Sequence, residues 1–176
     1  YGKNKGILPY SAQNCFGDMD MLVVGMHGKG LAGLKGCTKA EYCTHFSIWA
    51  MLNSPLMIGC DIRSMDDDAK EIMMNKEVIA INQDAQCAQP YEYGCDVWIK
   101  HLENGDIAIL LVNMKDKPAN MAVNIADIGI DLATNKKLQV RNLWTGEEFV
   151  AKNGIILDYH IPEHTVKFYR CKVIDK

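Results

Sequence analysis

Residues 97–112 read Val-Trp-Ile-Lys-His-Leu-Glu-Asn-Gly-Asp-Ile-Ala-Ile-Leu-Leu-Val, and they set the architecture of the second half of the chain. Two apolar runs, Val97–His101 and Ile107–Val112, flank the connection Glu103-Asn-Gly-Asp106. Asn-Gly is the strongest short hairpin signal, because both residues tolerate the positive φ angles that a tight turn requires. The segment therefore predicts two antiparallel strands joined by a turn.

The same period of two continues toward the C-terminus. We predict further strands at 121–125, 138–143, 155–161 and 165–173. Turn signals at Lys117-Pro118, Thr145-Gly146 and Asn153-Gly154 separate these strands. Short strands separated by regularly spaced turns are typical of a small antiparallel sandwich. We therefore assign residues 89–176 to an antiparallel β-sandwich domain.

The first half of the chain alternates short apolar runs with helix signals. Strands are predicted at Met21–Val24 and Leu56–Cys60. Thr38-Lys-Ala-Glu41 is a capping box, and the apolar stripe that follows it predicts a helix ending at Ser54-Pro55. A second short helix is predicted from Asp66 to about Asn75, with acidic residues at its positive end.

Residues 1–88 thus form two βα units, and the whole chain is of the α/β plus all-β class. Two such units cannot close a sheet, and a (β/α)8 barrel needs roughly 200 residues or more. The first residue is Tyr1 rather than Met. We therefore expect these units to be the end of a larger fold, which either pairs with a missing N-terminal barrel half or self-associates through its open edges.

The composition of the chain argues against two classes of function, nucleic-acid binding and membrane insertion. The 176 residues carry 19 Lys and Arg against 22 Asp and Glu, and 48% of them are hydrophobic. Basic residues do not cluster beyond Lys136-Lys137, and no apolar run approaches the roughly 20 residues that span a bilayer. This pattern argues against nucleic-acid and membrane partners. The seven Cys form no CxxC pair, so we expect reduced thiols and a cytoplasmic location.

Two acidic residues are candidates for chemistry. Asp18 and Asp20 would share one face of an extended strand about 6–7 Å apart. This separation falls within the range of roughly 5–9.5 Å between paired glycosidase carboxylates. Two solvated acids at a strand end are the alternative interpretation, and spacing alone favours this alternative.

Other motifs have simpler structural interpretations. Gly28-x-Gly30-x-x-Gly33, with Asp61 after the next apolar run, imitates a dinucleotide fingerprint, but the Thr38 cap starts the helix too late for one. His45 is expected to be partly buried and hydrogen-bonded. The acids at 66–68 suit a first helical turn, and the histidines lack metal-ligand spacing, so neither a metal nor a cofactor is expected.

Four segments together carry a family resemblance. Phe16-Gly-Asp-Met-Asp-Met-Leu-Val-Val-Gly25 resembles the W-N-D-P-D-M-L-x-V-G segment of the family 27 glycoside hydrolases, the α-galactosidases and α-N-acetylgalactosaminidases. Thr44–Arg63 and Asn75–Asp84 are similar to the next two family segments, and Leu143-Trp-Thr-Gly146 resembles part of their C-terminal β domain. The departures are Phe16 for Trp, Gly17 for Asn and Met19 for Pro.

This resemblance implies the last two βα units of a (β/α)8 TIM barrel followed by a β-sandwich. It implies part of a retaining α-galactosidase that hydrolyses terminal α-galactosyl residues. The nucleophile and the acid/base Asp would both lie upstream of Tyr1, so the chain alone is expected to be inactive. Asp20 and Met21 would be substrate-binding residues at the barrel mouth.

A second hypothesis comes from a different class of function. The β-sandwich could be a non-catalytic sugar-binding or assembly module, with Trp98 and Trp144 stacking on sugar rings. The same two side chains could equally anchor the sandwich core.

Overall fold

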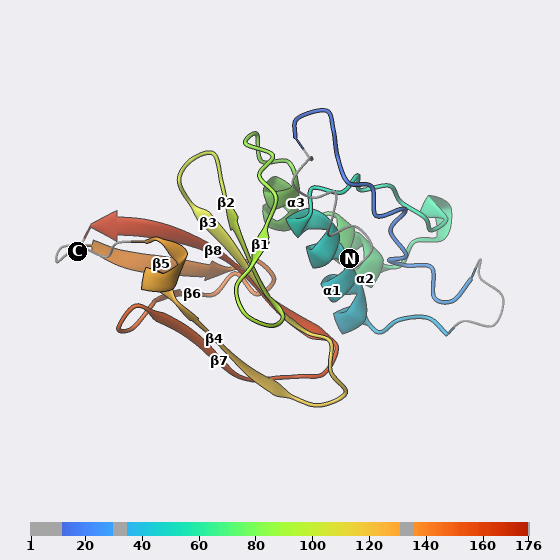
Figure 1. Ribbon diagram of the computed structural model, residues 1–176. Coiled ribbons are helices and arrows are strands. Elements are labelled where there is room, and N and C mark those ends of the chain that lie inside the picture. Colours follow the sequence, from blue (N-terminus) through green and yellow to red (C-terminus); the bar gives the residue numbers. More distant parts are fainter. Residues whose placement is uncertain (1–11, 30–34, 131–135, 176) are drawn as a thin grey trace. The chain divides into compact units, whose positions relative to one another are not determined.

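The computed structural model of the chain describes residues 12–29, 35–130 and 136–175. The chain divides into two compact units, Tyr1–Gln89 and Pro90–Lys176 (Figure 1). We call them the barrel unit and the sandwich unit. The described α-helices all belong to the barrel unit, and the eight described strands all belong to the sandwich unit. None of the described helices is long and apolar enough to cross a membrane.

Three α-helices and one 3-10 helix build the barrel unit. They are α1 (Lys39–Met51), η2 (Ile62–Ser64), α2 (Asp67–Met73) and α3 (Lys76–Asn82). The predicted capping box is confirmed: the Glu41 amide donates to Thr38 Oγ1 (3.2 Å), and Glu41 Oε2 accepts from the Thr38 amide (2.7 Å). Helix α1 contacts both α2 and α3 and buries Tyr42, Phe46 and Ala50.

The two strands predicted in the barrel unit are wrong in extent. Met21–Val24 and Leu56–Cys60 meet in a single parallel bridge between Leu22 and Ile58. The Leu22 amide donates to the Met57 carbonyl (2.7 Å), and the Gly59 amide donates to the Leu22 carbonyl (3.0 Å). The extended stretch is short because Asp20, before it, and Gly25, after it, both have positive φ. Order and direction still match a βαβ connection, since α1 links the two parallel segments.

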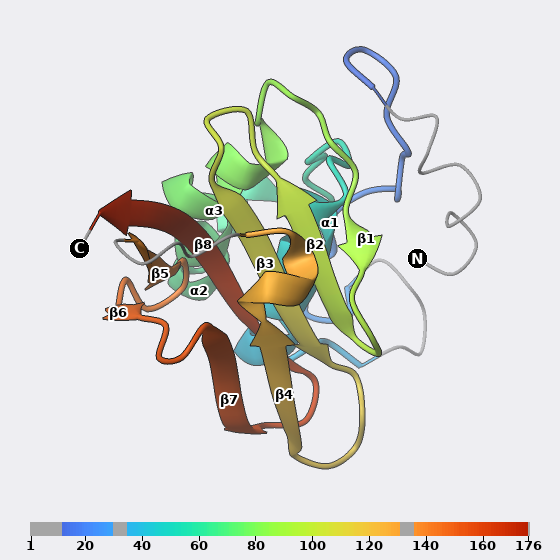
Figure 2. The same ribbon diagram turned by 60° about the vertical axis from the view of Figure 1, so that its left-hand side comes forward.

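The sandwich unit consists of two antiparallel sheets (Figure 2). One has six strands in the order β1-β2-β3-β8-β5-β6, and the other pairs β4 with β7. The strands are β1 (Tyr91–Glu92), β2 (Val97–His101), β3 (Ile107–Asn113), β4 (Ala119–Asn124), β5 (Lys136–Asn142), β6 (Glu148–Val150), β7 (Ile155–Ile161) and β8 (Thr165–Asp175). The 3-10 helix η3 (Ile125–Ile128) follows β4. The predicted sandwich and its four later strands are confirmed.

The β2–β3 hairpin forms as its sequence predicts. Val97 lies opposite Leu111, and His101 lies opposite Ile107. Gly105 adopts φ +83° in the connection, and its amide donates to the Leu102 carbonyl (3.0 Å). Gly105 thus supplies the positive φ of this connection, whereas Asn104 does not adopt one.

The core of the sandwich unit is made of alternate residues from both sheets. It includes Ile99, Ile109 and Val140 from the larger sheet and Val123 and Ile156 from the smaller one, all fully buried. Burying each such side chain stabilises the fold by roughly 1.5–3 kcal/mol.

One irregularity interrupts the smaller sheet. The register of β4 against β7 shifts between Ala119 and Met121, which marks a β-bulge. Pro118 directly precedes β4, and Pro162 directly follows β7.

Candidate functional site

The candidate site is the loop at residues 18–21, which enters the Leu22–Ile58 bridge. The Met19 amide donates to Ser54 Oγ (2.9 Å), so the loop is bonded to the chain just before the segment Leu56–Cys60. The Asp20 amide donates to Asp18 Oδ1 (2.8 Å), and the Met21 amide donates to Asp20 Oδ1 (2.7 Å). Asp20 itself has φ +72°, the left-handed conformation that non-glycine residues seldom adopt.

The predicted arrangement of Asp18 and Asp20 on one face of an extended strand is therefore wrong. The chain turns at Asp20, and each carboxylate accepts a hydrogen bond from a nearby backbone amide. Such local bonding is a common property of Asp in turns. Both residues are exposed. This geometry favours a binding or structural role for the two acids over that of a catalytic pair.

Helix α1 contributes two side chains to this loop. Trp49 Nε1 donates to the Asp20 carbonyl (2.8 Å), and the Val23 amide donates to His45 Nε2 (3.2 Å). The two rings lie one helical turn apart, with centroids 3.8 Å apart. Burial lowers the pKa of His45 to about 4, so the ring is neutral at pH 7 and Nε2 can accept. The prediction of a partly buried, hydrogen-bonded His45 is confirmed.

Met21, the other predicted sugar-binding residue, lies against Gly59. A Cβ atom at position 59 would lie 2.8 Å from Met21 Sδ and 2.6 Å from the Leu22 carbonyl oxygen. Only a glycine fits this contact without movement of its neighbours. Met21 still leaves 48% of its surface exposed, enough to contact a ligand.

Asp61 directly follows the segment Leu56–Cys60 and forms a local ion pair. Arg63 Nε donates to Asp61 Oδ1 (2.9 Å), and Arg63 Nη2 donates to Asp61 Oδ2 (2.8 Å). These bonds from the guanidinium lower the pKa of the Asp61 carboxyl. Both oxygens of Asp61 are thus occupied by its near neighbour, which leaves this residue poorly suited to hold a ribose.

The dinucleotide-like glycine segment lies only partly within the described residues. Gly30 and Gly33 lie outside the described residues, and α1 begins only at Lys39. Just before the motif, the His27 amide donates to Tyr42 Oη (2.9 Å), and His27 Nε2 pairs with the carboxylate of Asp66. The start of this loop is therefore anchored to α1 and to the N-terminus of α2.

The acids at 66–68 have the predicted helical role. Asp66 caps α2 by accepting from the Ala69 amide (2.7 Å), and Asp68 pairs with Lys39 (2.8 Å). Across the described ranges, no three His, Cys, Asp or Glu side chains converge as a metal site would require. The structure gives all seven cysteines as free thiols.

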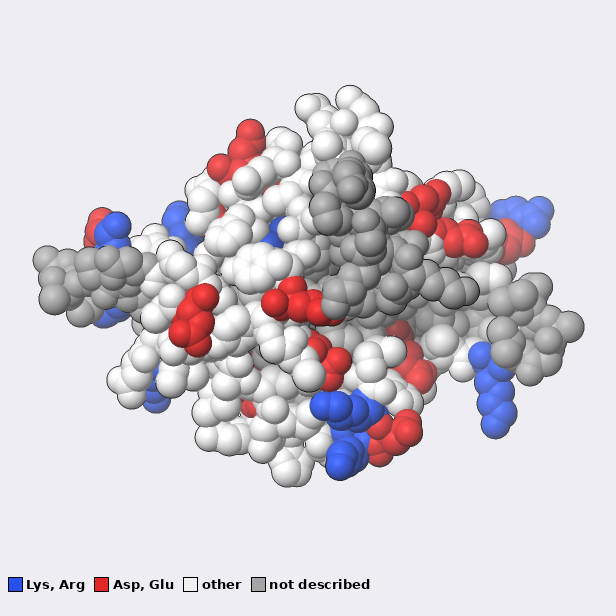
Figure 3. Space-filling view, viewed as in Figure 1, with Lys and Arg blue, Asp and Glu red and all other residues white. Residues whose placement is uncertain are grey.

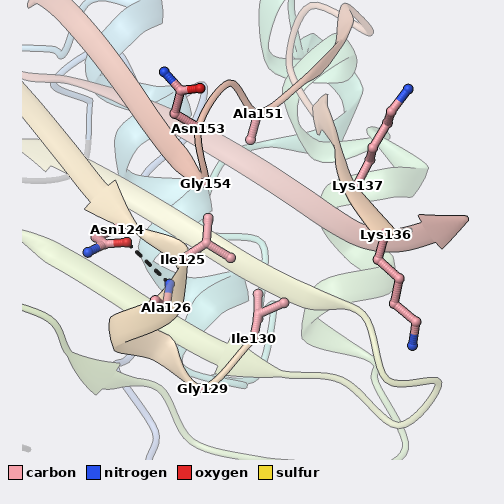
Figure 4. A pocket seen from close by; sticks show the side chains of 10 residues that line it. All are labelled: Asn124, Ile125, Ala126, Gly129, Ile130, Lys136, Lys137, Ala151, Asn153 and Gly154. Atoms are coloured by element: carbon pink, nitrogen blue, oxygen red, sulfur yellow. Dashed lines mark hydrogen bonds between the residues drawn. The ribbon is translucent and has the colours of Figure 1, made fainter. Parts of the chain in front are cut away.

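The sandwich unit offers a separate hollow of about 720 Å³ (Figure 4). Ile125, Ile130 and Ala151 line it, and the amino groups of Lys136 and Lys137 point away from them. Its lining, as far as the structure describes it, includes no carboxylate. The hollow therefore lacks the acid pair that glycoside hydrolysis requires.

The tryptophans of the sandwich unit differ in access. Trp98 in β2 leaves only 6% of its surface exposed, so it does not offer a free ring face. Trp144 is half-buried in the turn after β5, where its amide donates to Asn142 Oδ1 (2.9 Å).

On the face shown in Figure 3, acidic and basic side chains are scattered among uncharged ones.

Comparison with known proteins adds to this geometry. A family model described as "Alpha galactosidase A" matches residues 2–84, and one described as "Alpha galactosidase C-terminal beta sandwich domain" matches residues 92–171. The α-galactosidase of Oryza sativa is 36% identical over 164 residues, which cover 91% of this chain and 36% of the rice protein. The chain thus spans little more than a third of that relative.

Solved structures show the same fold. The crystal structure of α-galactosidase I from Mortierella vinacea matches with a TM-score of 0.77 and 30% identity, over 94% of this chain and 42% of that one. The α-galactosidase of Saccharomyces cerevisiae with raffinose matches with a TM-score of 0.80 at 20% identity, over 98% of this chain and 50% of that one. The chain therefore belongs to the family 27 glycoside hydrolases, of which it carries a C-terminal portion of the barrel domain followed by the β-sandwich domain.

Proposed function

We propose that this chain is part of a retaining α-galactosidase that hydrolyses terminal α-galactosyl residues. The main support is its identity of 36% and 35% to the α-galactosidases of Oryza sativa and Cyamopsis tetragonoloba, over 91% of its length in each case. The Saccharomyces cerevisiae enzyme of the same fold was solved with raffinose. An α-galactoside is accordingly the proposed substrate.

In this proposal Asp20 and Met21 bind the sugar. Asp20 Oδ1 accepts from the Met21 amide, whereas the structure gives Asp20 Oδ2 no bond among the described residues. A carboxylate oxygen accepts strong hydrogen bonds from hydroxyl groups, so Oδ2 suits a sugar hydroxyl. The exposed thioether of Met21 offers an apolar contact for the sugar ring.

The two catalytic carboxylates are proposed to come from other barrel strands. In a retaining mechanism, one carboxylate attacks the anomeric carbon while the other protonates the departing glycosidic oxygen. The second group then removes a proton from water, which attacks the anomeric carbon and releases the sugar with retained configuration. Asp18 and Asp20 are held by adjacent amides in one turn, which supports neither of these roles for them.

The complementary barrel strands are also the proposed partner of the barrel unit. Within the described residues, the pair Leu22–Ile58 is the only β-bridge between the segments Met21–Val24 and Leu56–Cys60. Parallel strands are normally paired on both edges and covered on both faces. Met57, Ile58 and Ile62 are exposed, as apolar side chains at such an incomplete sheet would be.

The test compares this chain with the complete glycosidase, meaning the chain together with the remaining barrel strands in one polypeptide or one complex. Hydrolysis of a chromogenic α-galactoside is measured for both. We expect no turnover by the chain alone and clear turnover by the complete glycosidase. Turnover by the chain alone would contradict the proposed source of the catalytic carboxylates.

Asp20→Asn tests the sugar contact in the complete glycosidase. Hydrogen bonds to a charged group contribute about 1.5–3 kcal/mol, so we expect kcat/KM to fall roughly 10- to 100-fold. Asp67→Asn on the exposed first turn of α2 is the matched control and should leave kcat/KM unchanged. Equal kinetics of the two variants would contradict the role of Asp20.

A further inference from the structure

We propose that Trp49, His45 and Gly59 are positioning residues that set the pose of the Asp20–Met21 pair. This inference rests on the proposed function, in which that pair binds the sugar. None of the three would touch the substrate in this arrangement. They act through the backbone and side chain of the residues that do.

Trp49 supports the unusual backbone of Asp20. A non-glycine residue with φ +72° persists only where surrounding contacts hold it. The indole of Trp49 donates to the carbonyl of Asp20 itself (2.8 Å), and the flanking amides of Met19 and Met21 are bonded as well. The direction of the Asp20 carboxylate follows from this backbone conformation.

His45 holds the chain on the other side of the pair. Its Nε2 accepts from the Val23 amide (3.2 Å), two residues beyond Met21. His45 and Trp49 lie at positions i and i+4 of α1, so both are presented on the same face of the helix. Their rings are in tilted contact, so each limits the movement of the other. One helix thus contacts the backbone of this loop at two points, the carbonyl of Asp20 and the amide of Val23.

Gly59 sets the position of the Met21 side chain. The thioether lies where a Cβ atom at position 59 would be, and the Gly59 amide also donates to the Leu22 carbonyl (3.0 Å). Any larger residue would displace Met21, the bridge or both. The absence of a side chain at Gly59 therefore determines how closely the Met21 thioether can pack against the segment Leu56–Cys60.

The first experiment follows amide hydrogen exchange by NMR on the 176-residue chain. Trp49→Phe keeps an aromatic ring in the stack but removes the N–H donor. We expect exchange at Met21 and Val23 to accelerate about five-fold, the factor that one neutral hydrogen bond supplies. Trp144→Phe in the sandwich unit is the matched control and should leave both rates unchanged. Equal rates at Met21 and Val23 in the two variants would overturn the inference.

The second experiment measures KM and kcat of the complete glycosidase. Because Asp20 binds the sugar in the ground state and the transition state alike, we expect Trp49→Phe and His45→Leu to raise KM about five-fold with kcat little changed. His45→Gln places an amide oxygen near the position of Nε2 and should restore KM. Failure of His45→Gln to restore KM when the variant folds normally would count against the role of His45.

Gly59→Ala should raise KM by displacing Met21, and Gly59→Ala with Met21→Ala should raise KM by less than the two single effects combined. Additive effects of the two substitutions would refute the contact. If Gly59→Ala does not fold, the exchange rates of Trp49→Phe still decide the proposal. An unchanged kcat/KM in Asp20→Asn would contradict the proposed sugar contact of Asp20, whereas the exchange rates report on the loop independently of activity.

Discussion

The two units of this chain bury their apolar residues in different ways. The sandwich unit closes a core between its own sheets, with Ile109, Val123 and Val140 fully buried. The barrel unit has three short helices and one parallel bridge, and it leaves Ile62 and Met74 about two-thirds exposed, at 68% and 70%. Antiparallel strands find partners nearby in sequence, whereas parallel strands depend on distant segments. The sandwich unit therefore carries its own stabilising contacts, whereas the exposed apolar residues of the barrel unit support the proposed pairing with further barrel strands.

Amide hydrogen exchange across the whole chain should show this difference most strongly. We expect the amides of β3 to exchange only on global unfolding, because this strand pairs with β2 and β8 along its length. The amides of Leu22 and Gly59 should exchange roughly a thousand-fold faster through local opening. Comparable protection in the two places would show that the barrel unit is as stable as the sandwich unit.

Truncation of a core residue should affect the sandwich unit strongly. Ile109→Ala removes a fully buried side chain, and we expect a loss of about 2–5 kcal/mol in the free energy of unfolding, measured with urea. Ile155→Ala on β7, where the side chain is 43% exposed, is the control and should cost less than about 1 kcal/mol. Similar losses for the two variants would contradict the assignment of the core.

Acid should weaken the barrel unit through His45. The unfolded chain binds a proton at this residue near pH 6.5, whereas burial lowers the pKa in the folded chain to about 4. The unfolding free energy should therefore fall as the pH drops from 6.5 to 4, with this residue contributing roughly 3 kcal/mol. The measurement is the urea midpoint of α-helical signal against pH. The His45→Gln variant should lose this part of the pH dependence, and an unchanged profile would argue against it.

The smallest effect is expected at the start of α1. Thr38→Ala removes the side-chain acceptor of the capping box, and we expect a loss of about 1 kcal/mol in helix stability, measured by circular dichroism. Thr145→Ala in a turn of the sandwich unit is the matched control for the loss of one hydroxyl. A helical signal that is equally stable in both variants would show that α1 is held by packing alone.

The sequence predicts the parts of this fold that depend on near neighbours. The β2–β3 hairpin follows from a period of two around Asn-Gly, and α1 follows from its capping box. The segment Val78–Ile81 lies in α3, yet its β-branched residues suit a strand equally well. The Asn75 cap and the contact with α1 make it helical. β1 and β6 were not predicted, because strands of two and three exposed residues carry no periodic signal.

The candidate site was only partly accessible from sequence. Asp20 and Met21 come from the family resemblance, and no pattern indicates the left-handed turn at Asp20. Trp49 and Gly59 contact this loop across 29 or more residues of chain, which periodicity cannot show. Gly59 did carry a usable signal, since an isolated glycine in an apolar run indicates a close approach of other atoms.

The β-bulge in β4 is relevant to the aggregation of this chain. β4 and β7 form a two-stranded sheet, so each has one edge that is not paired within the described residues. A straight edge with free backbone groups is a template for adding a foreign strand and for aggregation. The shifted register at Ala119, with Pro118 before β4 and Pro162 after β7, bends these edges and removes two amide donors beside them. We therefore expect this irregularity to make the addition of a foreign strand, and hence fibril growth, less favourable.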